Sequence, residues 1–232
     1  MAEHTGSRHG PEPIDRKLPS LHPVVRAGFI EYDRVIFFSD AVFAIAITLL
    51  AVNLHVPSTG NIGSAHDLHQ AIPAIFGFAI SFLVIAFFWI GHHGVFRFVV
   101  ALDRRLIALN LAFLSVIAFL PYPTDLLSAS SASAAVIFYA ACCALAGLLQ
   151  AGIWLYATRP SSDLTSQDAA PARTFFLLRM LRVPVVFLAS IPVAIAAPKY
   201  APFVWLLIWV TGSLINRFWR ARSQPNDSQP AE

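Results

Sequence analysis

The sequence predicts an all-α integral membrane protein with six transmembrane helices. Of its 232 residues, 57% are hydrophobic and only 12% are charged, whereas soluble domains average about 45–50% and about 25%. With so few charges the chain cannot cover the surface of a soluble domain, so lipid must be its main solvent. Two further observations support this class: long uncharged stretches recur along the chain, and basic residues concentrate in alternate loops.

Six stretches are long enough to cross a membrane, since a helix needs about 20 residues to span a hydrocarbon layer of about 30 Å. In order, they are residues 34–54, 71–91, 106–121, 134–157, 174–197 and 202–219. Only Asp40 interrupts the first stretch. The fifth is the least regular, because Arg179 and Arg182 lie near its start and Pro184 and Pro192 follow. We expect these stretches to form one six-helix membrane domain over residues 26–219.

The two ends of the chain differ in composition from this domain. Residues 1–25 are rich in Pro, Gly, His and charged residues, and they contain neither the apolar core of a signal peptide nor a helical period. Residues 220–232 have the same character. The sequence therefore predicts a disordered cytoplasmic tail at each end.

The distribution of basic residues predicts the orientation of the six helices. If the N-terminus is cytoplasmic, all 16 Lys and Arg residues except Lys199 fall on the cytoplasmic side. An odd number of helices would destroy this segregation, so we expect both termini in the cytoplasm of a multi-pass cell-membrane protein. The formal net charge of only +3 is explained by topology and indicates no nucleic-acid partner.

The first span contains an ionisable residue, Asp40, which costs a few kcal/mol or more inside a membrane unless it is paired or hydrated. At 100° per residue, Ser39 and Asp40 flank the side of the helix opposite an apolar stripe. The stripe consists of Phe38, Ala41, Ile45, Thr48 and Val52. Ser39 and Asp40 can point into the bundle while the stripe faces a symmetry axis. In the alternative, Asp40 pairs locally with Arg34 or Arg105 at the interface and the stripe faces lipid.

Three polar side chains lie at the end of the second span. Trp89 precedes His92 and His93 by one helical turn. Adjacent histidines do not face the same way on a helix, which argues against a metal or haem site made by this pair alone. Two alternatives remain. Trp89 is an interfacial anchor beside solvated histidines, or a histidine donates to Asp40 or Ser39 in a network that Asn110 joins.

Patterns for catalysis are missing from the chain. There is no Gly-x-Ser-x-Gly, no phosphate-binding glycine loop, no His-Glu-x-x-His and no pair of intramembrane carboxylates. Cys142 and Cys143 are adjacent in an apolar run and provide no disulfide framework or metal spacing. We therefore expect neither an enzyme nor a protein that needs a cofactor or a resident metal.

Four strings of residues together resemble a known family. They are Arg34-x-x-x-Phe38-Ser39-Asp40, Phe88-Trp89-x-x-His92-His93, Leu109-Asn110-Leu111, and Phe119-Leu120-Pro121-Tyr122-Pro123-Thr124. This pattern is similar to the signature of the transmembrane protein 175 family of potassium channels. The resemblance covers the first three spans, and the last three match only in apolar character and number.

The resemblance implies a homotetramer of six-helix subunits whose pore is lined by the first helix of each subunit. It implies no re-entrant pore loop, and no Thr-Val-Gly-Tyr-Gly filter string occurs in this chain. By position, the hydrophobic constriction falls on Ile45, the threonine ring on Thr48 and the next apolar ring on Val52. The implied polar network comprises Arg34, Phe38, Ser39, Asp40, Trp89, one or both of His92 and His93, and Asn110.

From these features we expect a passive, potassium-preferring cation channel in a lipid bilayer, with K⁺ passing close to Ile45 and Thr48. A ring of isoleucines makes a dry neck that gates by dewetting, and threonine hydroxyls replace part of the hydration shell of the ion. A proton-conducting or proton-gated channel is an alternative, because histidine titrates near neutrality. A non-conducting scaffold or a metal-dependent enzyme is a second alternative.

Overall fold

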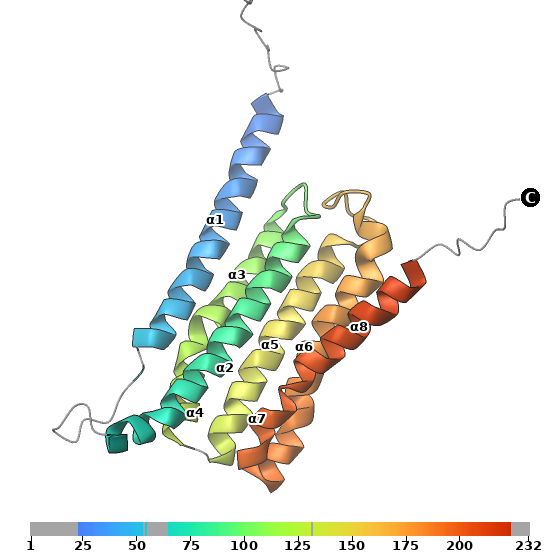
Figure 1. Cartoon of the computed structure of the whole chain (residues 1–232). Helices are drawn as coiled ribbons and strands as arrows, with labels where there is room; N and C mark the ends of the chain where they lie inside the picture. The colour runs from blue at the N-terminus through green and yellow to red at the C-terminus, as the bar shows by residue number, and fades with distance from the viewer. Residues whose placement is uncertain (1–22, 53, 55–64, 131, 224–232) are drawn as a thin grey trace, which may run out of the picture.

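The computed structural model of the protein describes residues 23–52, 54, 65–130 and 132–223, and its regular elements there are helices (Figure 1). These are α1 (Pro23–Val52), α2 (Ala65–Phe96), α3 (Arg104–Phe119), α4 (Pro121–Ala129), α5 (Ser133–Ala157), α6 (Ala169–Ala196), the short 3₁₀ helix η1 (Pro198–Tyr200), α7 (Ala201–Val204) and α8 (Leu207–Ser223). The predicted all-α class is confirmed.

Within the described residues, five segments are long and apolar enough to cross a membrane. They are Glu31–Val52, Ala71–Phe96, Arg104–Ala129, Ser133–Ala157 and Ala169–Ala196. The third segment joins α3 to α4 through Leu120, which keeps helical dihedrals. The sixth predicted span, residues 202–219, is divided between α7 and the 17-residue α8, and its crossing of the membrane stays a prediction.

The predicted boundaries differ from the observed ones at both ends of the domain. Helix α1 begins at Pro23, so residues 23–25, expected in the disordered tail, are helical. Helix α8 continues through Ser223, so residues 220–223 are helical as well. Pro23 is tolerated because it occupies the first helical position, and no glycine or proline interrupts residues 220–223. The remainder of each predicted tail lies outside the described residues.

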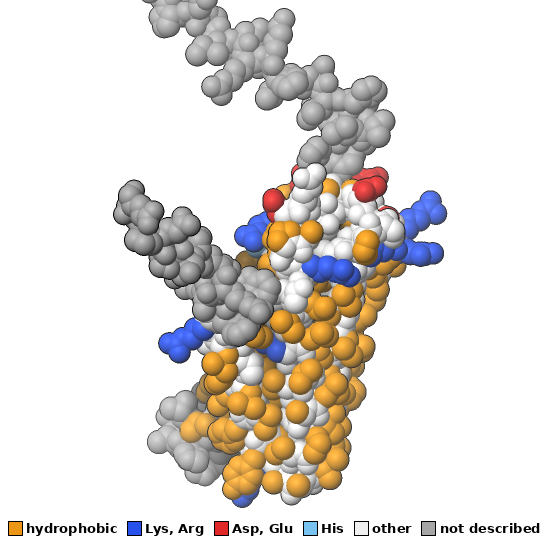
Figure 2. Space-filling model, turned by 90° about the vertical axis from the view of Figure 1, so that its right-hand side faces the viewer, with side chains coloured by type: hydrophobic (Ala, Val, Ile, Leu, Met, Phe, Trp, Pro, Cys, Tyr) orange, Lys and Arg blue, Asp and Glu red, His pale blue; other side chains and the backbone are white. Residues whose placement is uncertain are grey.

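The helices form a bundle in which α1 and α8 stand at opposite edges (Figure 1). Helices α5 and α6 make the most extensive pairing, α3 packs on α5, and α1 packs on α2 and α3. The first residue of α1 and the last residue of α8 lie at the same end of the bundle. Most charged side chains of the face shown in Figure 2 gather at that end, and below them the face is mainly apolar, with a few basic side chains. This distribution suits a chain that crosses a bilayer.

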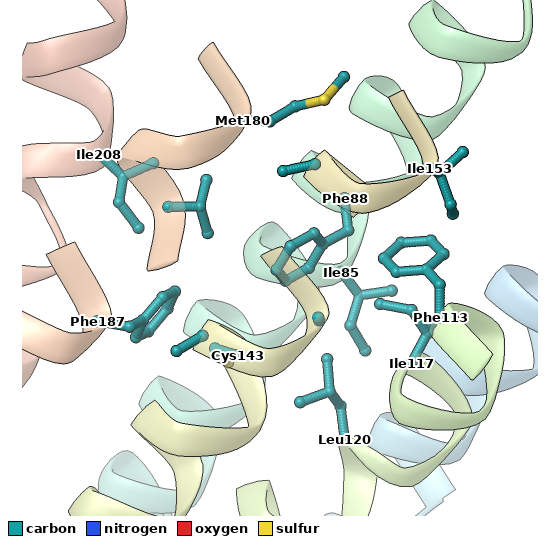
Figure 3. Packing of buried hydrophobic residues seen from close by; sticks show 14 of the residues in the cluster. Ile85, Phe88, Phe113, Ile117, Leu120, Cys143, Ile153, Met180, Phe187 and Ile208 are labelled. Atoms are coloured by element: carbon teal, nitrogen blue, oxygen red, sulfur yellow. The ribbon is translucent and has the colours of Figure 1, made fainter. Parts of the chain in front are cut away.

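The hydrophobic core is shared by every long helix, and Figure 3 shows its centre. Ile85 and Phe88 of α2 meet Phe113 and Ile117 of α3, and Phe187 of α6 lies on the other side of α5. The helices differ in the share of their residues that is buried within the subunit. In the most apolar 18-residue window of each span, 22% of the residues of α1 are buried, against 56% of those of α5. Helix α1 therefore leaves most of its surface available to lipid or to other subunits.

Helices α5 and α6 approach closely at Gly147 and Pro184. A Cβ atom at Gly147 would lie 2.6 Å from Pro184 Cδ and 3.2 Å from Pro184 N. Pro184 lies inside α6 without ending it, because the helix is held on the adjacent α5. The irregular fifth span predicted from its prolines is thus one continuous helix.

Two loops pair at the charged end of the bundle. The Val100 N–H donates to Leu164 O over 2.8 Å, and the Ser166 N–H donates to Phe98 O over 2.8 Å. Asp103 caps α3 by accepting from the Leu106 N–H at 2.7 Å and also accepts from the Tyr156 hydroxyl at 2.5 Å. Burial raises the pKa of Asp103, but these hydrogen bonds outweigh it and hold the pKa below its usual range. The α2–α3 and α5–α6 connections therefore act as one unit.

The close contact at Gly147 gives a stability prediction. Gly147→Ala places a methyl group against the rigid Pro184 ring, so α5 and α6 must separate, at a cost of about 1–3 kcal/mol. Gly152→Ala is the matched control, since no atom outside its own helix turn lies within 4 Å of a Cβ there, and it should stabilise the helix by up to about 1 kcal/mol. Thermal unfolding of the detergent-solubilised protein measures both. Equal shifts in Tm would contradict the packing argument.

Candidate functional site

Helix α1 has two distinct faces. Ser39, Phe43, Ala46 and Leu50 follow one another at helical spacing and are all buried against the bundle. The predicted apolar stripe lies on the other side and is exposed in the subunit. Its members are Phe38, Ala41, Ile45, Thr48 and Val52, with Ile45 57% and Val52 75% exposed. The structure therefore places the stripe and the polar residue Ser39 on different sides of α1, as the helical period predicts.

Thr48 is the polar member of this exposed stripe. Its hydroxyl donates back to the Ile45 carbonyl of its own helix over 2.9 Å. Because this bond uses the single hydroxyl hydrogen, the free lone pairs of the oxygen are directed away from the helix. Thr48 thus presents an acceptor oxygen, one helical turn beyond the apolar side chain of Ile45.

A chain of hydrogen bonds crosses from α2 through α3 to α1. His92 Nε2 lies 2.8 Å from Asn110 Oδ1, Asn110 Nδ2 donates to Ser39 Oγ at 3.0 Å, and Ser39 Oγ donates to the Val35 carbonyl at 2.8 Å. Ser39 uses its only hydrogen on Val35, so it must accept from the amide nitrogen of Asn110. The amide oxygen then faces His92, which is the donor.

The two histidines have different surroundings. His92 is buried among aromatic rings, with its centroid 4.3 Å from that of Phe96 and 5.7 Å from that of Phe113. His93 is exposed and stacks on Trp89 at 5.8 Å. Of the two histidines that the sequence offered, His92 is the one that contacts Asn110.

Asp40 belongs to a second, separate contact. It accepts a hydrogen bond from Trp89 Nε1 at 2.9 Å, and it is half-buried beside a cavity of about 160 Å³ between α1 and the end of α2. Tyr32 and Phe96 line the same cavity, and the Tyr32 hydroxyl donates to the Phe96 carbonyl over 2.6 Å. In the described structure Asp40 makes no ion pair with Arg34 or Arg105.

Two of the predicted network residues lie elsewhere. Arg34 and Phe38 are exposed on α1, and no described side chain pairs with Arg34. Residues 34 and 38 lie one helical turn apart and share a face of α1. This face is rotated by 100° or more from the buried position 39, which contacts Asn110. The structure thus joins His92, Asn110 and Ser39 in one string of hydrogen bonds. Asp40 and Trp89 form a separate hydrogen-bonded pair.

Other buried polar contacts were missed by the sequence analysis. Gln150 of α5 donates to the Phe88 carbonyl of α2 over 2.9 Å. Thr124 donates to Ser81, and Ser81 to the Tyr139 hydroxyl, over 2.8 and 3.1 Å. The signal for Gln150 is its position as a lone amide in an apolar stretch, which favours a partner on another helix. Among the described residues, no group of three or more His, Cys, Asp or Glu side chains is placed to hold a metal ion.

Comparison with known proteins is most informative over α1 to α3. A family model described as the endosomal/lysosomal potassium channel TMEM175 matches residues 34–121, which include the whole string from His92 to Ser39. A potassium channel of Streptomyces collinus is 37% identical over 181 residues, covering 72% of this chain and 87% of the relative. This chain belongs to the TMEM175 family. Its relatives are ion channels and not enzymes.

Two further TMEM175 proteins extend the comparison. The crystal structure of a lysosomal potassium-selective channel TMEM175 homologue from Chamaesiphon minutus matches with a TM-score of 0.69 and 25% identity, covering 79% of this chain and 97% of that one. An endosomal/lysosomal proton channel TMEM175 of Danio rerio is 29% identical over 166 residues, which is 67% of this chain but 31% of the relative. The TMEM175 fold therefore extends beyond the region of the family model.

The string through Asn110 predicts a loss of stability when the amide is removed. Asn110→Leu keeps a similar volume but leaves His92 and the Ser39 oxygen without their partner, at a cost of about 1–3 kcal/mol for each unpaired group. Thermal or denaturant unfolding of the purified protein measures this loss. Ser115→Ala, an exposed position on α3 whose hydroxyl donates only to its own helix, is the control and should change stability by less than about 0.5 kcal/mol. A wild-type Tm for Asn110→Leu would show that the string contributes nothing.

Proposed function

We propose that this TMEM175 protein is a passive, potassium-preferring channel in the cell membrane, with its pore lined by α1 of each of four subunits. The observation that carries the proposal is the exposed stripe on α1 with Ile45, Thr48 and Val52. A span whose most apolar 18-residue window has only 22% of its residues buried in its own subunit needs other surfaces around it. The Streptomyces collinus relative named as a potassium channel supports K⁺ as the permeant ion.

In the proposed pore, Ile45 acts as the gate. Four isoleucine side chains around an axis form a narrow apolar neck from which water withdraws, and the neck conducts only after it widens or rotates. Val52 forms a second apolar ring farther along the stripe. No cofactor takes part, since the gradient of K⁺ and the membrane potential drive the ion.

Thr48 supplies the polar part of the proposed route. Four hydroxyl oxygens replace part of the hydration shell of a cation, which favours K⁺ because K⁺ is dehydrated more easily than Na⁺. A ring of hydroxyls lacks the carbonyl cage of a filter loop, so the preference should be modest.

The hydrogen-bonded string gives α1 its orientation in this proposal. Ser39 is buried on the side of α1 away from Ile45 and Thr48, and its contact with Asn110 opposes rotation of the helix. The Trp89–Asp40 contact adds a second constraint one residue later. We infer that both contacts keep the stripe directed at the axis, with both chain termini in the cytoplasm.

Proton conduction is the second candidate, and the naming of the Danio rerio relative as a proton channel favours it. Purified protein in liposomes with defined K⁺, Na⁺ and H⁺ gradients separates the two. We expect K⁺ flux to exceed Na⁺ flux, with current that persists when no proton gradient is applied. Flux carried only by protons would replace the potassium proposal with the alternative.

Ile45→Asn tests the gate. An amide at this position hydrates the neck, so basal K⁺ flux should rise by about tenfold or more, since even 1.4 kcal/mol removed from a barrier is a factor of ten. Ile45→Leu keeps the ring apolar and should conduct at about the wild-type level. Planar-bilayer recording at fixed voltage measures both. If Ile45→Asn and Ile45→Leu behave alike, Ile45 does not lie in the conduction path.

A further inference from the structure

A groove lined by residues of α2, α6, α7 and α8, with no described α1 residue in its lining, has no part in the proposed pore. It has a volume of about 290 Å³ and lies between α2, α6 and the segment that joins α7 to α8. All of its lining side chains are apolar, and Leu83, Phe87, Val183, Phe187 and Phe203 are among them. Along α2 the lining runs from position 76 to position 88, which corresponds to about 18 Å of helix.

A basic side chain lies at one end of this groove. Arg182 directly precedes the lining residue Val183, and its guanidinium carbon lies 4.7 Å from the centroid of Phe87, another lining residue. The guanidinium also contacts α8 at Gly212, where a Cβ would collide with it.

Arg182 has unused hydrogen-bonding capacity. Its Nε is buried and has no hydrogen-bond partner among the described residues. It makes no ion pair with a described carboxylate, and Arg179, one turn earlier on α6, adds a like charge. A guanidinium in an apolar span needs an anion or water, and its planar set of donors matches a phosphate group.

We propose that this groove binds an anionic phospholipid, with one acyl chain between α2 and α7–α8 and the phosphate on Arg182. The polarity of the site supports this arrangement. Phe87 lies toward the end of α2 that carries the charged loops, and position 76 lies toward the opposite end. The headgroup thus faces the charged end of the bundle, and the tail follows the groove into the apolar zone seen in Figure 2.

The position of the groove favours lipid over a second copy of the chain as its occupant. Helices α1 and α8 lie at opposite edges of the bundle (Figure 1), so subunits that meet through α1 present the groove outward. This step rests on the proposed pore. Lipid binding is measured without ion flux, however, so its failure is distinguishable from failure of the channel function.

The test is binding of phosphatidylglycerol to the delipidated, detergent-solubilised full-length protein, followed by native mass spectrometry. We expect retention of phosphatidylglycerol over phosphatidylcholine, and no displacement by inorganic phosphate, because the acyl chain contributes to binding. Arg182→Gln should weaken the binding of phosphatidylglycerol by about tenfold or more, as expected when a charge-assisted hydrogen bond is lost. Leu83→Trp fills the groove and should have a similar effect while keeping Arg182.

Matched controls decide the result. Leu145→Trp alters a side chain on α5 that is 48% exposed, against 47% for Leu83, but lies outside the groove. Arg104→Gln removes an exposed charge at the start of α3. Both should bind phosphatidylglycerol like the wild type. Wild-type binding by Arg182→Gln or Leu83→Trp would overturn the proposal, and so would a photo-crosslinker at position 83 that captures a second copy of the chain.

Discussion

The structure depends on the need of every polar group inside a membrane to find a partner. On α1 that partner is Asn110, which receives from His92 and donates to Ser39. An amide suits this position because it both accepts and donates, so two helices that offer a donor and an acceptor are joined by one side chain. Rotation of α1 would move Ser39 away from Asn110 and leave the amide nitrogen without its acceptor in an apolar medium, where an unsatisfied group costs several kcal/mol. The direction of its exposed face follows from this constraint.

The rest of the bundle supplies a rigid support for α1. Helices α5 and α6 meet so closely at Gly147 and Pro184 that a methyl group does not fit between them. Gln150 connects α5 to α2 through the Phe88 carbonyl, and the paired loops close one end. Packing is therefore densest far from α1, and α1 is attached mainly through polar contacts and one row of buried side chains. The orientation of α1 therefore depends on a few specific contacts, whereas the support depends on extensive packing.

Much of this arrangement was predictable from the sequence, for physical reasons that differ between elements. The helical period separates Ser39 from Ile45 and Thr48 without any knowledge of neighbours, and the polar residues Ser39, His92 and Asn110 are conspicuous because they interrupt apolar stretches. The choice between His92 and His93 was not predictable, since it depends on the rotation of α2 against α3. Gln150 and Ser81 acquire their roles only when helices distant in sequence come together. The last span is divided between α7 and α8 next to Trp205, whose indole donates to Ser190 of α6, a contact that the sequence of the span does not reveal.

The hydrogen bond of the Thr48 hydroxyl bears on whether the exposed stripe of α1 suits cations or anions. Its hydrogen is committed to the Ile45 carbonyl, so the group has nothing left to donate to chloride or any other anion. Only its oxygen lone pairs remain, and these attract positive charge. In the proposed pore, a short bond inside one helix would thus favour cations over anions, without a single formal charge on the exposed stripe.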